Sequence, residues 1–256
     1  VRALARTGGG SAAQPLAAHL PRESSPAVRQ AALFALGRIR QPQSIPLLAK
    51  ALVEEPAYEV RYGAVDALSK FNQPEAVEAL VQALNAKLSD NLRGRIITAL
   101  GSMKALEAAP AVERALFSDK EESVRRAAAR SLAAIRGEEA APVLAAALAK
   151  EHDPKVVLRI IEQLGDRGSP KAAKPLAAAL LDARQPELRT AIIAALARTP
   201  DWRAKLDCFT ELFQAGSYER ENISPRDVID GLAVSADELK QNPQLLTDLL
   251  LEQTLG

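Results

Sequence analysis

The 256 residues are enough for one large domain or two small ones with a substantial core. Hydrophobic residues make up 48% of the chain and the formal net charge is +1, so no overall charge excess points to nucleic acid or an anionic membrane. The single cysteine excludes an internal disulfide framework, and no apolar run reaches the roughly 20 residues that span a bilayer. The apolar residues are mainly Ala and Leu, without sustained alternation of apolar and polar residues, which predicts an all-α fold.

A 32-residue repeat starts with the first residues, where VRALAR predicts part of a helix from an earlier unit. Leucine recurs with this period, preceded eight residues earlier by Val or Leu, and arginine follows that residue in most copies. The leucines are Leu4, Leu36, Leu68, Leu100, Leu132, Leu164 and Leu196; the arginines are Arg29, Arg61, Arg93, Arg125 and Arg189, with Val157 in the fifth copy. A small residue follows each leucine from Leu36 onward, which predicts close approach of neighbouring helices.

A second apolar set runs in the same period, at Leu16, Leu48, Leu80, Val112, Leu144, Leu176 and Cys208. The segments between the two sets contain Gly, Pro, Asn and Asp, which are typical of turns. Each unit is therefore expected to hold two helices, with Pro46, Pro110 and Pro142 near helix starts. Within 28–40, residues Val28, Ala32, Leu36 and Ile39 share one face and are expected in the core.

No such unit buries its apolar face alone, so the pattern predicts a right-handed α-solenoid of stacked two-helix repeats. The stretch PAVRQAALFALGRIRQPQSIPLLAKALVEE resembles the HEAT repeat, in particular the short bacterial subtype called phycobilisome-lyase-type HEAT-like repeats. The resemblance covers about residues 1–215. It implies a superhelical scaffold whose second helices line the concave side. It also implies an interaction module in most members, and an enzyme or a chromophore-lyase subunit in a few.

The repeated arginine has two interpretations: a structural ladder that bonds carbonyls or carboxylates of the next unit, or a functional basic stripe. Other positions of the second helices face away from the core and vary between units, which is typical of a binding surface. Phe34 and Tyr62 stand in neighbouring units, and cations outnumber acids. We therefore expect a protein partner, with an acidic or amphipathic segment, to contact Gln30, Phe34, Arg38, Tyr62, Asp66, Lys70, Arg95, Arg126, Arg130, Leu158, Arg159 and Glu162. A solvated helix face with a chance excess of arginine is the alternative.

No motif predicts catalysis, a metal or a cofactor. His19 and His152 stand four units apart, and neither is followed by Glu as in the iron-binding pairs of the HEAT-like deoxyhypusine hydroxylases. Cys208 takes a core position. Gly8, Gly9 and Gly10 stand at an inter-helix turn without the Lys and Ser/Thr of a phosphate loop.

The repeat fades near residue 215, where Trp202, Leu206, Cys208, Phe209 and Leu212 suit an end cap. We expect a domain of residues 1–215 and an acidic helical extension of residues 216–256. Residues 201–256 carry a net charge of −6, and the extension either docks on a partner or competes for the basic face. We expect a non-catalytic interaction scaffold, with a chromophore-lyase-like or pigment-protein maintenance factor as the alternative and nucleic-acid binding as the third. The compartment stays open, with the cytoplasm slightly favoured and a removed N-terminal leader as an alternative.

Overall fold

A computed structural model describes residues 12–166, 169–182 and 185–199, and every regular element in these ranges is a helix. The predicted helix at residues 1–6, the end cap and the acidic extension lie outside the described residues. The pattern of contacts divides the chain into two compact units, Val1–Ala147 with Glu151–Ile160, and Leu148–Lys150 with Ile161–Gly256. We refer to them as unit 1 and unit 2.

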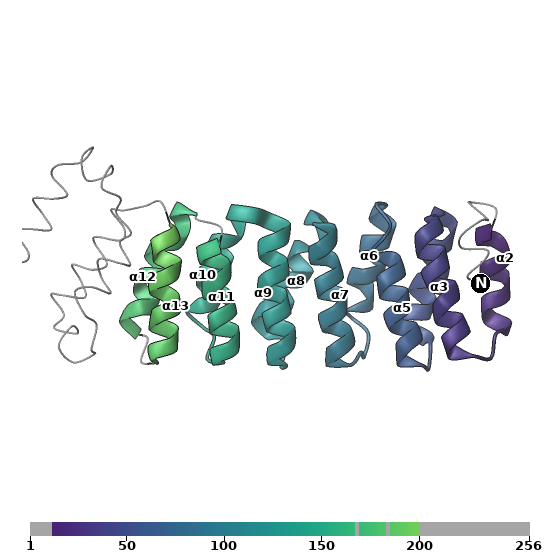
Figure 1. The fold of residues 1–256 in the computed structure, drawn as a ribbon, viewed down its shortest axis with the longest axis horizontal. Helices are drawn as coiled ribbons and strands as arrows, with labels where there is room; N and C mark the ends of the chain where they lie inside the picture. Colours follow the sequence, from purple (N-terminus) through teal and green to yellow (C-terminus); the bar gives the residue numbers. More distant parts are fainter. Residues whose placement is uncertain (1–11, 167–168, 183–184, 200–256) are drawn as a thin grey trace, which may run out of the picture. The chain divides into compact units, whose positions relative to one another are not determined.

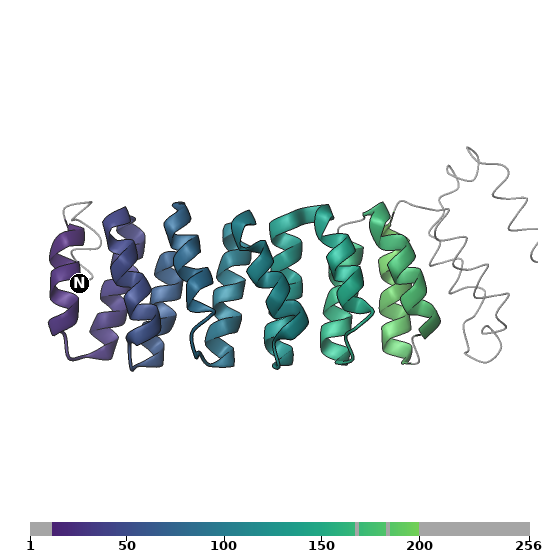
Figure 2. The same cartoon turned by 180° about the vertical axis from the view of Figure 1, so that it is seen from behind.

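Unit 1 is built from two layers of helices (Figure 1). The front layer contains α3 (Pro26–Ile39), α5 (Tyr58–Leu68), α7 (Asp90–Met103) and α9 (Glu122–Arg136). The layer behind contains α4 (Ile45–Glu54), α6 (Pro74–Ala83) and α8 (Ala109–Ser118), and it faces the viewer in Figure 2. The short helix α2 (Ala13–His19) begins the unit, and α10 (Ala141–Leu148) and α11 (Pro154–Asp166) contribute their residues up to Ala147 and Ile160.

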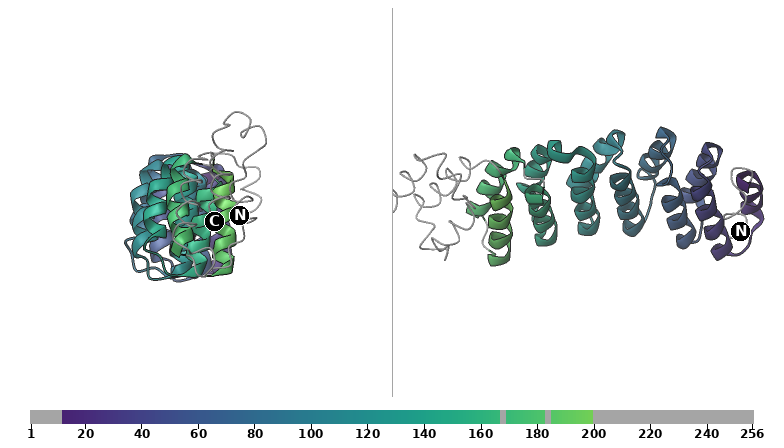
Figure 3. Two further views of the ribbon diagram at one scale, coloured as in Figure 1. Left: turned by 90° about the vertical axis from the view of Figure 1, so that its left-hand side faces the viewer. Right: turned by 45° about the horizontal axis from the view of Figure 1, so that its top comes forward.

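Unit 2 contains the remainder of α11 together with α12 (Pro170–Asp182) and α13 (Pro186–Arg198), which pack against each other. Within unit 1, α3 packs on α5, α5 on α7, and α7 on α9, in chain order. The right-hand view of Figure 3 shows these helices in a row. The all-α repeat architecture predicted from the 32-residue period is therefore confirmed.

Proline and the helix-capping residues explain where the helices begin. Pro46, Pro110 and Pro142 occupy the second position of α4, α8 and α10, as expected, because the first turn of a helix has no use for their missing N–H. Ser89 caps α7, with its hydroxyl oxygen accepting a hydrogen bond from the Leu92 backbone N–H at 3.4 Å.

The core stripe is wider than the sequence analysis predicted. Ala32 and Leu36 are buried as expected, but Val28 and Ile39 are only half-buried. Their counterparts Val60 and Phe71 are fully buried between complete units, whereas the helix before α3 is α2, which is only seven residues long. A further set with the same period, missed from sequence, fills the core at Leu33, Val65, Ile97, Ala129 and Ile161.

Glycine lets front-layer helices approach closely at two places in unit 1. A Cβ atom added at Gly37 would lie 2.6 Å from Cα of Ala67, and one added at Gly101 would lie 2.7 Å from Cβ of Ser131. Carbon atoms in contact normally stay about 3.5–4.0 Å apart, so neither site accommodates a larger residue without movement. The prediction that the small residue after the repeated leucine permits close helix packing is confirmed at these positions.

Among the described residues, we find no helix that is both long and apolar enough to cross a membrane.

Candidate functional site

The candidate site is the exposed face of the front layer of unit 1, which we call the recognition face. Residues three and four apart share a side of a helix, so each front-layer helix aligns one column of side chains on this face. The members that the sequence predicted are Gln30, Phe34 and Arg38 on α3, Tyr62 and Asp66 on α5, Lys70 in the turn after α5, Arg95 on α7, and Arg126 and Arg130 on α9.

Two aromatic side chains on this face, those of Phe34 and Tyr58, are exposed to solvent. Phe34 is 55% exposed, as expected of an anchor rather than a core residue. Tyr58 is 74% exposed and was missed by the sequence analysis, because it stands one turn before the columns considered there. Its ring meets the ring of Tyr62 edge to face, with centroids 6.1 Å apart and an interplanar angle of 87°, so α5 carries a pair of tyrosines.

Arg95 connects α7 to the tyrosine pair and to Asp66. Its guanidinium carbon lies 5.2 Å from the centre of the Tyr62 ring, within the range of cation–π attraction. Two of its nitrogens bond the Asp66 carboxylate, with Nε 3.0 Å from Oδ1 and Nη2 2.6 Å from Oδ2. Tyr62 is half-buried and already engaged, so Phe34 and Tyr58 are the aromatic residues most available to a partner.

The recognition face carries more cations than anions. Arg38, Lys70, Arg95 and Arg130 are exposed and Arg126 is half-buried, and Asp66 is the acidic residue among the predicted members on α3 to α9. Clustered charges of one sign create a local electrostatic potential whatever the net charge of the chain. This face therefore attracts anionic groups, although the chain as a whole has a net charge of only +1.

Four predicted members have other roles or lie apart. Gln30 donates its side-chain amide to the Glu59 carbonyl oxygen at 2.9 Å and so links α3 to α5. Leu158 is 36% exposed on α11, and Arg159 and Glu162 are half-buried and already engaged by neighbouring groups. Glu162 belongs to unit 2 and is not grouped with the others.

The repeated arginine forms the structural ladder that the sequence suggested, which removes the alternative of a basic stripe for three of its members. Each reaches an acid 26 residues later, in the loop before α5, α9 or α11. The pairs are Arg29–Glu55 at 3.0 Å, Arg93–Asp119 at 2.8 Å and Arg125–Glu151 at 2.7 Å. These side chains are only 10–18% exposed, so they are largely withdrawn from any partner.

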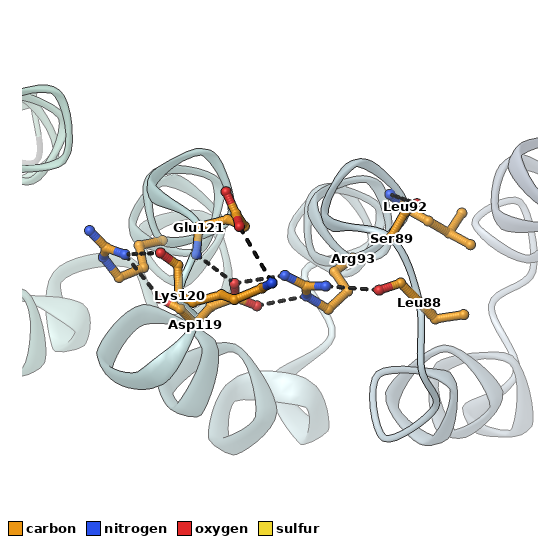
Figure 4. Close-up of polar contacts among 8 residues, drawn as sticks. Leu88, Ser89, Leu92, Arg93, Asp119, Lys120 and Glu121 are labelled. Atoms are coloured by element: carbon orange, nitrogen blue, oxygen red, sulfur yellow. Dashed lines mark hydrogen bonds and ion pairs between the residues drawn. The ribbon is translucent and has the colours of Figure 1, made fainter.

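Each ladder acid also organises the turn that follows it. Figure 4 shows Asp119 between Arg93 and the backbone N–H of Glu121, from which it accepts a hydrogen bond at 3.0 Å, while Arg93 also donates to the Leu88 carbonyl oxygen. Burial alone would raise the pKa of the Asp119 carboxyl, but these hydrogen bonds hold it below its ordinary value. The pKa of Glu151 is lowered in the same way, against burial, by Arg125 and two backbone N–H groups.

The residues weighed for catalysis or metal binding do not converge. The His19 ring lies 3.3 Å from Glu23 on a largely exposed surface, and His152 is exposed in a loop. In the part of the chain that the structure describes, no group of three or more His, Cys, Asp or Glu residues could hold a metal ion. Cys208 and Gly8 to Gly10 lie outside the described residues.

Comparison with known proteins identifies the family. No curated protein sequence matches the chain. Among solved structures, the complex of CpcE and CpcF of phycocyanin lyase from Nostoc is 21% identical with a TM-score of 0.42, over 87% of this chain and 82% of that one. Human deoxyhypusine hydroxylase in complex with glycerol is 21% identical with a TM-score of 0.38, over 94% of this chain and 88% of that one. Both likenesses are too distant to carry an argument about function.

The sequence model of HEAT repeats matches residues 13–89, 77–158 and 146–222. These overlapping matches follow the paired helices and the 32-residue period of the described chain and extend over most of its length. The protein therefore belongs to the HEAT-repeat family.

Proposed function

We propose that the protein is a non-catalytic interaction scaffold whose recognition face binds an acidic or amphipathic segment of another protein. The observation that carries the proposal is the exposure of Phe34 and Tyr58 beside a surplus of cations. Aromatic residues and arginine dominate the binding energy of protein interfaces, whereas stability gives no reason to expose two rings on neighbouring helices. HEAT repeats favour the same class of function, since their stacked helices present extended surfaces.

The decisive experiment is affinity purification with the full chain, followed by mass spectrometry and an absorption spectrum of the captured material. Changing Phe34 and Tyr58 together to Ala should weaken the binding free energy of the captured partner by about 1–4 kcal/mol, the range found for anchor residues of interfaces. Leu106→Ala is the matched control. Leu106 is an exposed apolar residue (64%), but it lies in the short 3-10 helix Leu106–Ala108 before α8 and not on a front-layer helix. Equal capture by the wild type and the double variant would remove the recognition face from consideration.

The same experiment separates the other functions. A pigment with a visible absorption band in the captured material would favour the chromophore-lyase-like alternative. Binding of nucleic acid that falls steeply with salt would favour the third function instead.

The acidic extension of residues 216–256 is part of the proposal as a competitor for the recognition face. Its sequence pairs acidic residues with leucines, the chemistry expected of the partner segment. Replacing Asp248 and Glu252 by Lys in the full chain should then raise the affinity for the captured partner. Unchanged or lower affinity would show that the extension does not compete.

A further inference from the structure

The seam between α5 and α7 lacks the ion pair that ties its neighbours together. The ladder joins α3 to the start of α5, α7 to the start of α9, and α9 to the start of α11 through Arg–acid pairs. At α5 the arginine is Arg61, but the residue 26 positions later is Lys87 instead of an acid. Arg61 donates to the Glu55 carbonyl oxygen in its own loop. In the sequence register of the ladder, this seam therefore has two cations where its neighbours have a cation and an anion.

The same seam also lacks the glycine contact. Gly37 lets α3 approach α5 and Gly101 lets α7 approach α9. The corresponding residue at the end of α5 is its C-cap Ser69, whose hydroxyl donates to the Asp66 carbonyl oxygen. Neither of the two devices that hold the neighbouring seams is present between α5 and α7.

Instead, the Asp66–Arg95 pair crosses this seam, and it lies on the recognition face. Its side chains are 44% and 43% exposed, against 10–18% for the ladder pairs. Exposed ion pairs contribute little to stability, because water solvates both charges when they separate. The carboxylate of Asp66 can therefore leave Arg95 at small cost, while Tyr62 keeps the guanidinium in position.

We propose that Arg95 is the residue of the recognition face that binds a carboxylate of the partner segment, and that Asp66 occupies this position until the partner replaces it. The proposal rests on the proposed function. The planar fork of a guanidinium matches a carboxylate through two parallel hydrogen bonds, as it already does with Asp66. Tyr58 offers an exposed ring beside Tyr62 for an apolar neighbour of that carboxylate. The partner is thus an acidic segment with apolar side chains next to its carboxylates.

The test uses the full chain and a fluorescein-labelled peptide made of three Leu-Glu-Glu-Leu repeats, with binding measured by fluorescence anisotropy. Asp66→Asn should tighten binding by up to about fivefold, because it removes the competing carboxylate of an exposed pair. Arg95→Lys should weaken binding, since it keeps the charge but loses the fork. Glu78→Gln, which removes the same charge from an exposed site on α6, should leave the affinity unchanged.

Coupling between the two residues is the sharpest part of the test. If Asp66 acts through Arg95, Asp66→Asn should have no effect in a chain that also carries Arg95→Gln. Helical circular dichroism and the melting temperature of each variant exclude loss of fold as the cause. If Asp66→Asn still raises the affinity for the peptide in the Arg95→Gln background, or if Glu78→Gln raises it equally, the effect is a general one of charge and the proposal is overturned.

The remaining outcomes separate this inference from the proposed function. If Phe34→Ala weakens peptide binding but Asp66→Asn does not strengthen it, the recognition face stands and the role of Arg95 is wrong. If the peptide binds to no variant, or a single-stranded oligonucleotide binds more tightly than the peptide, the assignment of an acidic protein segment is wrong as well.

Discussion

At the scale of single residues, the ladder acids serve two helices at once. Asp119 accepts from the Arg93 guanidinium and from the Glu121 backbone N–H, so it ties α7 to the turn that starts α9. Removing it leaves a largely buried guanidinium without its acid and a backbone N–H without its acceptor. Such a carboxylate affects both the free energy of unfolding and the dependence of that free energy on pH.

We expect Asp119→Asn to lower the free energy of unfolding at pH 7 by about 1.5–3 kcal/mol, the range for hydrogen bonds to charged groups. The folded pKa of Asp119 is depressed, so its contribution is fully present above the unfolded value of about 3.9 and is lost as pH falls below it. The variant should therefore lose less stability than the wild type between neutral pH and pH 3. Urea denaturation across this range measures both effects, and parallel curves would contradict the linkage.

The ladder pair that is missing between α5 and α7 can be restored by one substitution. Lys87→Glu places an acid where Glu55, Asp119 and Glu151 stand in the other repeats, within the register of Arg61. We expect a gain of about 0.2–1 kcal/mol in the free energy of unfolding, since an added pair at a partly exposed site is worth little more. In a double-mutant cycle with Arg61→Met, measured by urea denaturation, the gain should disappear. A gain that survives this change would mean that the glutamate acts without Arg61.

At the scale of helices, glycine has opposite roles at two positions of the front layer. Gly37 stands where α3 meets Ala67 of α5, whereas a Cβ added at Gly94 on α7 would meet nothing within 4 Å. Both residues lie inside α-helices, where glycine costs about 1 kcal/mol relative to alanine through its backbone entropy. Only the first is required by packing.

Alanine at these two positions should therefore change stability in opposite directions. Gly37→Ala should destabilise by about 1–3 kcal/mol, because α3 and α5 must separate to admit the methyl group. Gly94→Ala should stabilise by about 0.5–1 kcal/mol through helix propensity. Thermal and urea denaturation of the two single variants check the signs, and a loss at Gly94 as large as at Gly37 would contradict the packing argument.

The sequence predicted the helices better than their contacts. The 32-residue period gave the two-helix unit, the proline positions and the Arg29 register, because all of these repeat. The period did not predict the hydrogen bond from Gln30 to the Glu59 carbonyl oxygen or the Asp66–Arg95 ion pair. The residues that make these contacts do not recur from one 32-residue repeat to the next. Tyr58 was missed for the same reason: the equivalent residues are Pro26, Asp90, Glu122 and Pro154, so no pattern marks it.

At the scale of the whole molecule, the chain forms two compact units, and the boundary falls inside α11. Stability in a repeat protein is approximately a sum over repeats and their nearest neighbours, so local damage should remain local. Gly165 in unit 2 repeats the role of Gly37, because a Cβ added there would lie 2.6 Å from Cβ of Ala195.

Amide hydrogen exchange can test this independence. Gly165→Ala should raise exchange in α12 and α13 while protection in α3 to α7 stays as in the wild type, and Gly37→Ala should show the reverse pattern. Exchange that rises equally in both units for either variant would show instead that the chain unfolds as one cooperative body.

The close-packing glycines have a consequence for how such a chain can be lengthened or shortened. Gly37, Gly101 and Gly165 follow one another at intervals of 64 residues, with Ser69 and Ala133 at the positions between them and Ala197 at the position that follows. The packing of the helices therefore repeats after two of the 32-residue repeats, although the hydrophobic pattern repeats after one. Excising 32 residues would bring two like seams together, whereas adding or removing 64 would preserve their alternation. A designer who wishes to resize this scaffold should cut it in multiples of four helices.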